Sequence, residues 1–438
     1  MMNISTRLLY GNTVTQNNPP AQAGGIVRLP GAYAGKPAAF MLDADTLSKH
    51  TMLIGGTGCG KTTLFYHFVS QIKRTMTSDD VMIIFDSKGD FHSKFHDPQT
   101  DLVIGNSKQY ISQSAHWNIY KEVLADGWDE RDFIMNAQEI CKSFFFERTQ
   151  NTTNAFFPNA ARDLLAAIII AFIRAGITDE SRKRKYFYNN ELKMFLDLSD
   201  RQMLIDFLKT RPDTAAIISY ISNDSPQSQG VISEMHSIAR EILIGVFAER
   251  GAFSMREFVR RKGKKTLFVE YDLAIGSTLT PVYRLMFDLA LKEALGRNKA
   301  QGNVYLICDE FKLLPHLRHI DDGVNFGRSL GVKVFAGIQS IEQLYEIYGQ
   351  SRGRNIAAGF SSIYAFRSND AATRDYVSGI FGKNVVIEQY QRLDNQIVEE
   401  KRNGQTVEDW DMNSLKVGEA IVGLPFSQPF RFYFDMYK

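Results

Sequence analysis

Residues 55–62 read Gly-Gly-Thr-Gly-Cys-Gly-Lys-Thr, and the rest of the fold can be inferred outward from this glycine-rich segment. It matches the phosphate-loop pattern G-x-x-x-x-G-K-[ST], in which glycines let backbone N–H groups turn inward around phosphate oxygens. Residues 51–54 are mostly apolar and predict a strand, whereas residues 61–74 lack glycine and proline and predict a helix. A chance match in a glycine-rich turn would lack these flanks. The stretch therefore predicts a nucleoside triphosphate site in a βαβ unit with a parallel sheet.

Each part of the loop has an expected task. The N-terminal end of the following helix faces the bound anion and attracts it. Lys61 is expected to reach the β- and γ-phosphates, and the Thr62 hydroxyl to hold Mg²⁺. Cys59 is either only a small residue or a position that makes the site sensitive to thiol reagents. The residues expected to bind the nucleotide are Gly55, Gly56, Thr57, Gly58, Cys59, Gly60, Lys61, Thr62 and Thr63.

Acidic residues follow two apolar strands, at Asp86 and at Asp309-Glu310. A motor ATPase needs two neighbouring carboxylates, one for the Mg²⁺ shell and one to polarise the attacking water as general base. Only the second strand offers such a pair, so we assign Asp309 to the metal and Glu310 to the water. The alternative is an ordinary acid pair at a helix N-terminus. Asp86 and Lys88 either form a structural ion pair at a strand end or lie beside the nucleotide.

The order of segments along the chain predicts three parts. Residues 1–130 hold an irregular N-terminal arm, strands near residues 25–42 and the first part of a nucleotide-binding domain. Residues 131–262 lose strand patterns and predict an all-α insertion. Strand patterns return in residues 263–438, the second part of the same domain, around a polar stretch at 388–413. The expected fold class is therefore α/β, with a central, mostly parallel sheet and an inserted all-α domain.

Composition gives no global signature of nucleic-acid binding, because 51 lysines and arginines face 49 aspartates and glutamates. The densest basic run, REFVRRKGKK at 256–265, is either a DNA contact or a solvated turn, and RKRK at 182–185 leaves the same alternatives. Three cysteines without metal-ligand spacing are typical of a reduced, cytosolic chain. The apolar run at 164–173 is shorter than the ~20 residues of a membrane span and predicts a buried helix.

Several segments together resemble the conjugative type IV coupling proteins, the TraG/TraD-type ATPases. The match covers nearly the whole chain from about residue 25, and it implies a RecA-like nucleotide-binding domain with an all-α insertion. It also implies a hexameric ring that hydrolyses ATP with Mg²⁺ and moves DNA, expected to be single-stranded, through a central channel. The matching segments are GGTGCGKTT at 55–63, FDSKGDF at 85–91, HWNIY at 116–120, FPNAARDLLAAIIIAFI at 157–173, LICDEFKLLP at 306–315, GRSLGVKVFAGIQSIEQLYEIYG at 327–349 and the strand-rich segment near 418–434.

The resemblance assigns roles to two further residues. Gln339 falls on the family's glutamine sensor, whose amide can hold the catalytic water or the γ-phosphate. Arg328 falls on the arginine that reaches a neighbour's nucleotide, where a planar guanidinium stabilises developing charge. Arg352 and Arg354 compete with Arg328 for this task. The ordinary alternatives are a polar strand end for Gln339 and a surface cation for Arg328.

Usual members of that family carry an N-terminal pair of membrane-spanning helices, and no such pair is found in this sequence. We therefore expect a cytoplasmic protein, peripheral to the inner face of the cell membrane. It is a natural soluble variant, a partner of a separate membrane anchor, or a truncated chain. The expected partners are a relaxase or relaxosome and components of a type IV secretion channel. The rival hypotheses are an FtsK/HerA-type DNA translocase and a non-translocating, ATP-dependent substrate-docking factor.

Overall fold

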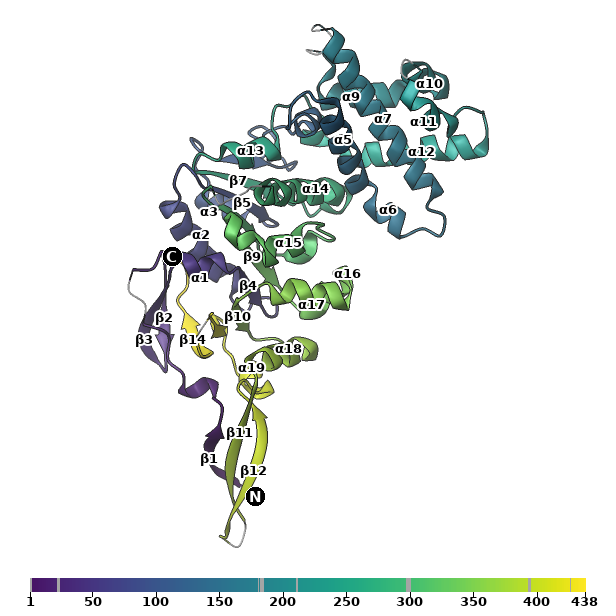
Figure 1. The fold of residues 1–438 in the computed structure, drawn as a ribbon. Helices are drawn as coiled ribbons and strands as arrows, with labels where there is room; N and C mark the ends of the chain where they lie inside the picture. Colours follow the sequence, from purple (N-terminus) through teal and green to yellow (C-terminus); the bar gives the residue numbers. More distant parts are fainter. Residues whose placement is uncertain are drawn as a thin grey trace.

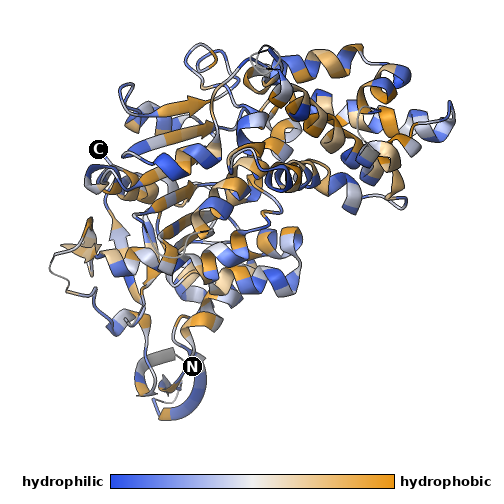
Figure 2. Ribbon diagram, turned by 45° about the horizontal axis from the view of Figure 1, so that its top comes forward, coloured by the Kyte–Doolittle hydropathy of each residue, from blue (hydrophilic) through white to orange (hydrophobic). Residues whose placement is uncertain are grey.

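The computed structural model has a large twisted sheet in its centre, a group of helices at one end and a small sheet at the other (Figure 1). Figure 2 shows that the strands of the large sheet are apolar for most of their length, which is expected when helices cover both faces. The structure describes residues 2–21, 24–179, 181, 185–209, 212–296, 301–392, 395–425 and 427–438.

The large sheet is mostly parallel, as predicted. Among the described residues it has eleven strands in the order β3-β2-β14-β13-β10-β4-β9-β8-β5-β7-β6. All neighbours from β10 to β6 are parallel, and the other four strands extend the β10 edge with antiparallel pairing. The bounds are β2 Val27–Tyr33, β3 Lys36–Leu42, β4 Thr51–Ile54, β5 Val81–Asp86, β6 Leu102–Ile104, β7 Lys265–Glu270, β8 Val304–Cys308, β9 Val332–Ile338, β10 Ser362–Phe366, β13 Glu419–Gly423 and β14 Phe430–Phe434.

Helices cover the two faces of this sheet and create two apolar cores. Successive strand residues point to opposite faces, so Ile83 packs in one core and Ile84 in the other. In Figure 1, α1 to α3 lie on one side of the sheet and α14 to α18 on the other. Their bounds are α1 Ala44–Ser48, α2 Lys61–Thr75, α3 Asp90–Phe95, α14 Gly276–Leu295, α15 Ile320–Asn325, α16 Ile341–Tyr348, α17 Gln350–Ala358 and α18 Ala371–Phe381. Short 3-10 helices span Val14–Gln16, Phe311–Leu313 and Gly327–Leu330.

A group of helices interrupts the sheet between β6 and β7. The apolar run at 164–173 lies in the middle of α7 and is buried throughout, which confirms the predicted buried helix. Within the described part of the chain, no helix combines the length and apolarity that a membrane crossing requires. The basic residues at 182–184 lie outside the described residues. The bounds are α4 Ile119–Val123, α5 Glu130–Phe144, α6 Phe146–Gln150, α7 Phe156–Thr178, α9 Asn189–Leu198, α10 Arg201–Leu208, α11 Ala215–Ser219, α12 Pro226–Ile242 and α13 Met255–Arg261, with 3-10 helices at Pro212–Thr214 and Gly245–Phe247.

The small sheet corrects two expectations from the sequence. The supposedly irregular arm begins with a strand, β1 Met2–Tyr10, which pairs antiparallel with β11 Lys383–Gln391. The polar stretch at 388–413 holds most of a hairpin, in which β11 pairs with β12 Ile397–Gln405, followed by α19 Asp409–Asn413. In this ribbon, which projects from the body (Figure 1), the hairpin strands were not recognised, because the buried face of β11 mixes polar Asn384 and Glu388 with Val386 and most of β12 is exposed.

Candidate nucleotide-binding site

The phosphate loop joins the carboxyl end of β4 to the start of α2, as the sequence predicts. Gly60 adopts a φ of 115°, which favours glycine, and a Cβ atom there would lie 3.1 Å from the backbone of Gly418. The loop is also held by its neighbours: the Gly56 N–H donates to the Arg367 carbonyl at 2.9 Å, and the Gly418 N–H donates to the Cys59 carbonyl at 2.9 Å. The loop backbone is therefore fixed in shape before any ligand binds.

Lys61 and Thr62 occupy the first turn of α2. The Lys61 ammonium donates to the carbonyls of Gly55 at 2.6 Å and Gly56 at 3.0 Å, so it folds over the loop that it is expected to serve. The Thr62 hydroxyl donates to Oδ2 of Asp309 at 2.7 Å. Burial raises the pKa of Asp309 to about 6, against the opposing effect of the Thr62 hydrogen bond. A hydroxyl in contact with a carboxylate behind a phosphate loop is a donor set that fits Mg²⁺.

Glu310 and Gln339 come together at the ends of β8 and β9, which are adjacent parallel strands. The Gln339 amide nitrogen donates to both carboxylate oxygens of Glu310, at 3.1 and 2.9 Å. The Thr57 hydroxyl of the phosphate loop donates to the Gln339 amide oxygen at 3.4 Å. The carboxylate expected to activate water is thus linked through Gln339 to the phosphate loop.

Arg328 lies at the amino ends of the parallel strands, whereas the phosphate loop of its own chain lies at their carboxyl ends. It precedes β9, whereas Gln339 follows β9, and seven residues at ~3.3 Å each separate them by roughly 20 Å. Its guanidinium pairs with Asp45 at 2.6 Å, and both side chains are more than half exposed. Arg328 therefore has no contact with the site of its own chain.

The two competing arginines have partners of their own. The Arg352 guanidinium pairs with Asp321 at 2.5 Å and donates to the carbonyls of Leu317 and Arg318. It clamps the segment that follows the acid pair. Arg354 donates to Gln350 on its own helix at 3.3 Å.

Asp86 and Lys88 do not form the ion pair that was one of the two alternatives. The Asp86 carboxylate is buried at the end of β5 and accepts backbone N–H groups of His92 at 2.8 Å and Lys88 at 3.4 Å. Burial raises its pKa in spite of these bonds. Asp86 thus shapes the turn after β5, and the Lys88 side chain is exposed there.

Cys59 is buried within the loop, and burial raises the pKa of its thiol. Reaction with thiol reagents needs an accessible thiolate. The burial of Cys59 and its raised pKa disfavour both access and ionisation. The structure therefore supports the first of the two alternatives, a small residue that fills the loop.

A cavity of about 540 Å³ lies beside the loop, and most of its lining residues were not predicted from the sequence. The loop residues and Gln339 form one side. The other side follows β10, so the available signal was a polar segment, Arg367–Asp370, directly after the predicted strand at 362–366. The lining residues are Gly56, Thr57, Gly58, Cys59, Gln339, Ser340, Gln343, Arg367, Ser368, Asn369, Asp370 and Val417.

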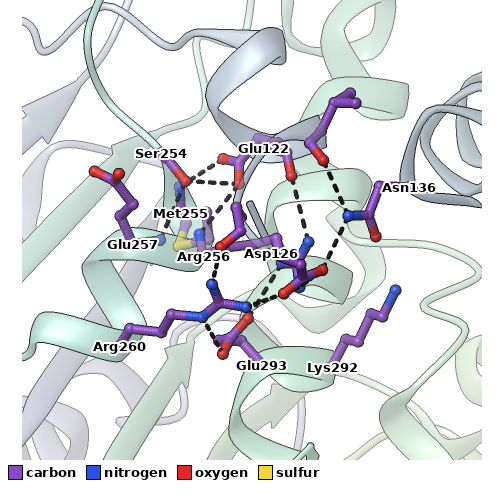
Figure 3. Close-up of polar contacts among 12 residues, drawn as sticks. Glu122, Asp126, Asn136, Ser254, Met255, Arg256, Glu257, Arg260, Lys292 and Glu293 are labelled. Atoms are coloured by element: carbon purple, nitrogen blue, oxygen red, sulfur yellow. Dashed lines mark hydrogen bonds and ion pairs between the residues drawn. The ribbon is translucent and has the colours of Figure 1, made fainter. Parts of the chain in front are cut away.

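The basic run at 256–265 is structural at its start, whereas Arg261, Lys264 and Lys265 at its end are exposed, as in the solvated turn that was one of its two alternatives. Figure 3 shows Arg256 and Arg260 pointing at Asp126 and Glu293. Arg256 is 4% exposed, reaches both Asp126 oxygens at 2.8 and 2.7 Å, and pairs with Glu293 at 3.1 Å. Arg260 pairs with the same two acids. These four side chains, the root clasp, join the segment entering the helical region to the segment leaving it.

Comparison with known proteins gives the geometry a family. The family model described as the type IV secretion-system coupling protein DNA-binding domain matches residues 38–411. Coupling protein TraD of Escherichia coli is 21% identical over 345 residues, which are 77% of this chain and 44% of TraD. Conjugal transfer protein TraG of Agrobacterium fabrum is 25% identical over 256 residues, 55% of this chain and 37% of TraG. The chain thus spans less than half the length of these relatives.

Solved structures agree on the fold. The bacterial conjugative coupling protein TrwB, in an unbound monoclinic form, superposes with a TM-score of 0.73 at 19% identity, over 100% of this chain and 94% of that one. TrwB in complex with ADP and Mg²⁺ gives a TM-score of 0.70 at 20% identity, over 100% and 95% of the two chains. The α/β, RecA-like architecture expected from the sequence is therefore confirmed. Since the family model covers most of its length, this chain belongs to the family of type IV secretion-system coupling proteins.

Proposed function

We propose that the protein is an ATP-hydrolysing motor that couples a DNA substrate to a type IV secretion channel in conjugation. One observation supports this above all: the ends of β4, β8 and β9 bring a phosphate loop, an acid pair and a glutamine into one hydrogen-bonded site. The E. coli and Agrobacterium relatives carry names that refer to coupling and conjugal transfer. The TrwB structures with ADP and Mg²⁺ and with an ATP analogue support ATP and Mg²⁺ as the cofactors of this chain.

In this proposal each residue of the site has one task. The Lys61 ammonium leaves the loop carbonyls and holds phosphate oxygens, while Thr62 and Asp309 hold the metal ion. Bound Mg²⁺ supplies neutralisation of the phosphate charge. Glu310 accepts the proton of the attacking water at a lone pair that the Gln339 amide leaves open, while the Gln339 hydrogen bonds keep the carboxylate oriented. Gln339 then connects the phosphate loop, through Thr57, to the general base Glu310.

The proposal extends to the assembly. Arg328 lies at the end of β9 that is remote from the phosphate loop of its own chain. This position supports a contribution of Arg328 to the nucleotide site of a neighbouring subunit in a homo-hexamer. The nucleotide-binding domain would be formed by residues 1–130 and 263–438, with the all-α insertion at 131–262. Single-stranded DNA in the central channel, a relaxase or relaxosome, channel components and a separate membrane anchor are the proposed partners, at the inner face of the cell membrane.

The experiment that tests this proposal is ATP hydrolysis across a range of protein concentrations, with and without single-stranded DNA. We expect turnover to rise steeply with protein concentration, because a site shared between subunits forms only when the subunits associate. We also expect it to rise when DNA is added, because a DNA-translocating motor hydrolyses ATP faster on its DNA substrate. The variant Glu310→Gln, purified in parallel, controls for contaminating ATPases. Turnover that stays negligible under every condition, with ATP still bound, would instead favour the ATP-dependent docking factor.

A further inference from the structure

The order of the strands fixes which way a nucleotide lies in the site. The catalytic groups Glu310 and Gln339 lie at the ends of β8 and β9, on one side of the loop that follows β4. The reacting phosphate must therefore face β9, and the nucleoside end must point toward β10 on the other side. The cavity of about 540 Å³ continues in that direction.

Arg367 stands where this cavity meets the loop. It directly follows β10, and its carbonyl accepts the Gly56 N–H at 2.9 Å, so its backbone is fixed against the loop. Its side chain is exposed and lines the cavity. No described residue forms an ion pair or hydrogen bond with its guanidinium, whereas the nearby Arg374 pairs with Asp409. The side-chain donors of Arg367 are therefore available to a ligand in the cavity.

The one acid among the described lining residues, Asp370, forms no ion pair with this guanidinium. The Asp370 carboxylate accepts from the Ser340 hydroxyl at 2.7 Å and from the Thr373 backbone N–H at 2.9 Å, because it caps the start of α18. These bonds and one from the Thr373 hydroxyl all end on Oδ2 of Asp370, so this carboxylate is held at the start of α18. The cavity therefore offers an uncompensated cation next to a phosphate loop.

We infer that Arg367 binds the nucleotide at its α-phosphate and ribose end, as a binding residue that takes no part in the cleavage step. The planar guanidinium suits phosphate oxygens, and a charge-assisted hydrogen bond is among the stronger polar contacts. This inference rests on the proposed nucleotide site. It differs from the proposed task of Arg328, which concerns the reacting phosphate of a neighbour.

The test is nucleotide binding by Arg367→Ala, measured by calorimetry with ADP and with a non-hydrolysable ATP analogue. Both affinities should fall by the same factor, roughly 10-fold, since a hydrogen bond to a charged group is worth about one such factor or more. Turnover at saturating ATP should stay within about twofold. Arg367→Lys should recover part of the affinity, and Arg131→Ala, which removes an exposed arginine of α5, should change nothing.

The outcomes separate the inference from the proposed function. Weaker binding of the ATP analogue with unchanged ADP binding would put Arg367 at the reacting phosphate and overturn the inference. Unchanged binding of both nucleotides would overturn it as well. If the wild-type protein and Arg131→Ala bind neither nucleotide, the proposed site itself is wrong. Circular dichroism of each variant checks folding, and the structural contact of Arg367 is made by its backbone, which the substitutions keep.

Discussion

Replacing Arg256 by methionine tests whether the basic run at 256–265 serves the fold or binds DNA. The side chain is 5% exposed and makes its contacts to Asp126 and Glu293 inside the root clasp. Removing one partner of a buried ion pair costs about 3–5 kcal/mol, because the remaining charge keeps its desolvation cost. Arg260 still pairs with both acids in the variant, so the lower end, about 3 kcal/mol, is expected.

Arg260→Met is the matched control, since it removes the same charge from the same clasp. Arg260 is 35% exposed, and ion pairs that solvent reaches contribute about 0–1 kcal/mol. Urea denaturation of both variants, followed by circular dichroism at one pH, measures the difference in the free energy of unfolding. ATP hydrolysis with single-stranded DNA is then measured at several salt concentrations.

The reasoning is refuted if Arg256→Met costs less than about 1 kcal/mol and also weakens the stimulation by DNA with a shallower salt dependence. Each lost phosphate contact lowers the slope of log affinity for DNA against log salt concentration by roughly one unit. Such a result would mean that Arg256 leaves Asp126 and Glu293 to bind phosphates. A large loss of stability with an unchanged salt slope for the properly folded fraction supports the clasp.

Three further predictions concern catalysis and pH. Glu310→Gln should bind ATP normally and lose about 100-fold or more in hydrolysis, as expected for removal of a general base; normal turnover would mean that another group activates the water. Arg328→Ala should lower turnover only at concentrations where subunits associate, and an equal loss in dilute monomer would exclude action on a neighbour. Burial raises the pKa of Asp288 on α14 to about 6, so the folded protein holds this proton more tightly than the unfolded chain. Stability is therefore lost as pH rises through 6, and between pH 5 and 7.5 wild type should lose about 1 kcal/mol relative to Asp288→Asn in urea denaturation; a constant difference would contradict this.

Local chemistry explains which parts of the site could be predicted. The phosphate loop at 55–63 needs its glycines, lysine and threonine at fixed spacing along the chain, so the motif can be recognised from the sequence alone. Asp309 and Glu310 were found because an apolar strand directly precedes them. The pairing of Glu310 with Gln339 then follows once β8 and β9 are neighbours.

Features that depend on distant partners could not be predicted in the same way. Arg367 belongs to the cavity only because β10 lies next to β4, an order that the sequence does not state. The structural task of Arg256 was not foreseen, because its partners, Asp126 and Glu293, lie 130 and 37 positions away. Strands β11 and β12 carry polar residues on both faces, so no period marked them, whereas β1 alternates Met2, Ile4 and Leu8 with Asn3, Ser5 and Arg7, a strand pattern that the composition of residues 1–50 obscured.

The pairing of β1 with β11 has a consequence for how the protein is made. Ser5 and Gln389 meet in this sheet although 384 positions separate them. At ribosomal speeds of ~5–20 residues per second, the first strand waits roughly 20–80 s for its partner to emerge. The helical region, whose contacts are closer in sequence, can complete its fold within that interval. Until then the backbone N–H and C=O groups of β1 have no partner. On a crowded polysome, the β1 segments of neighbouring nascent chains must therefore be kept from pairing with one another.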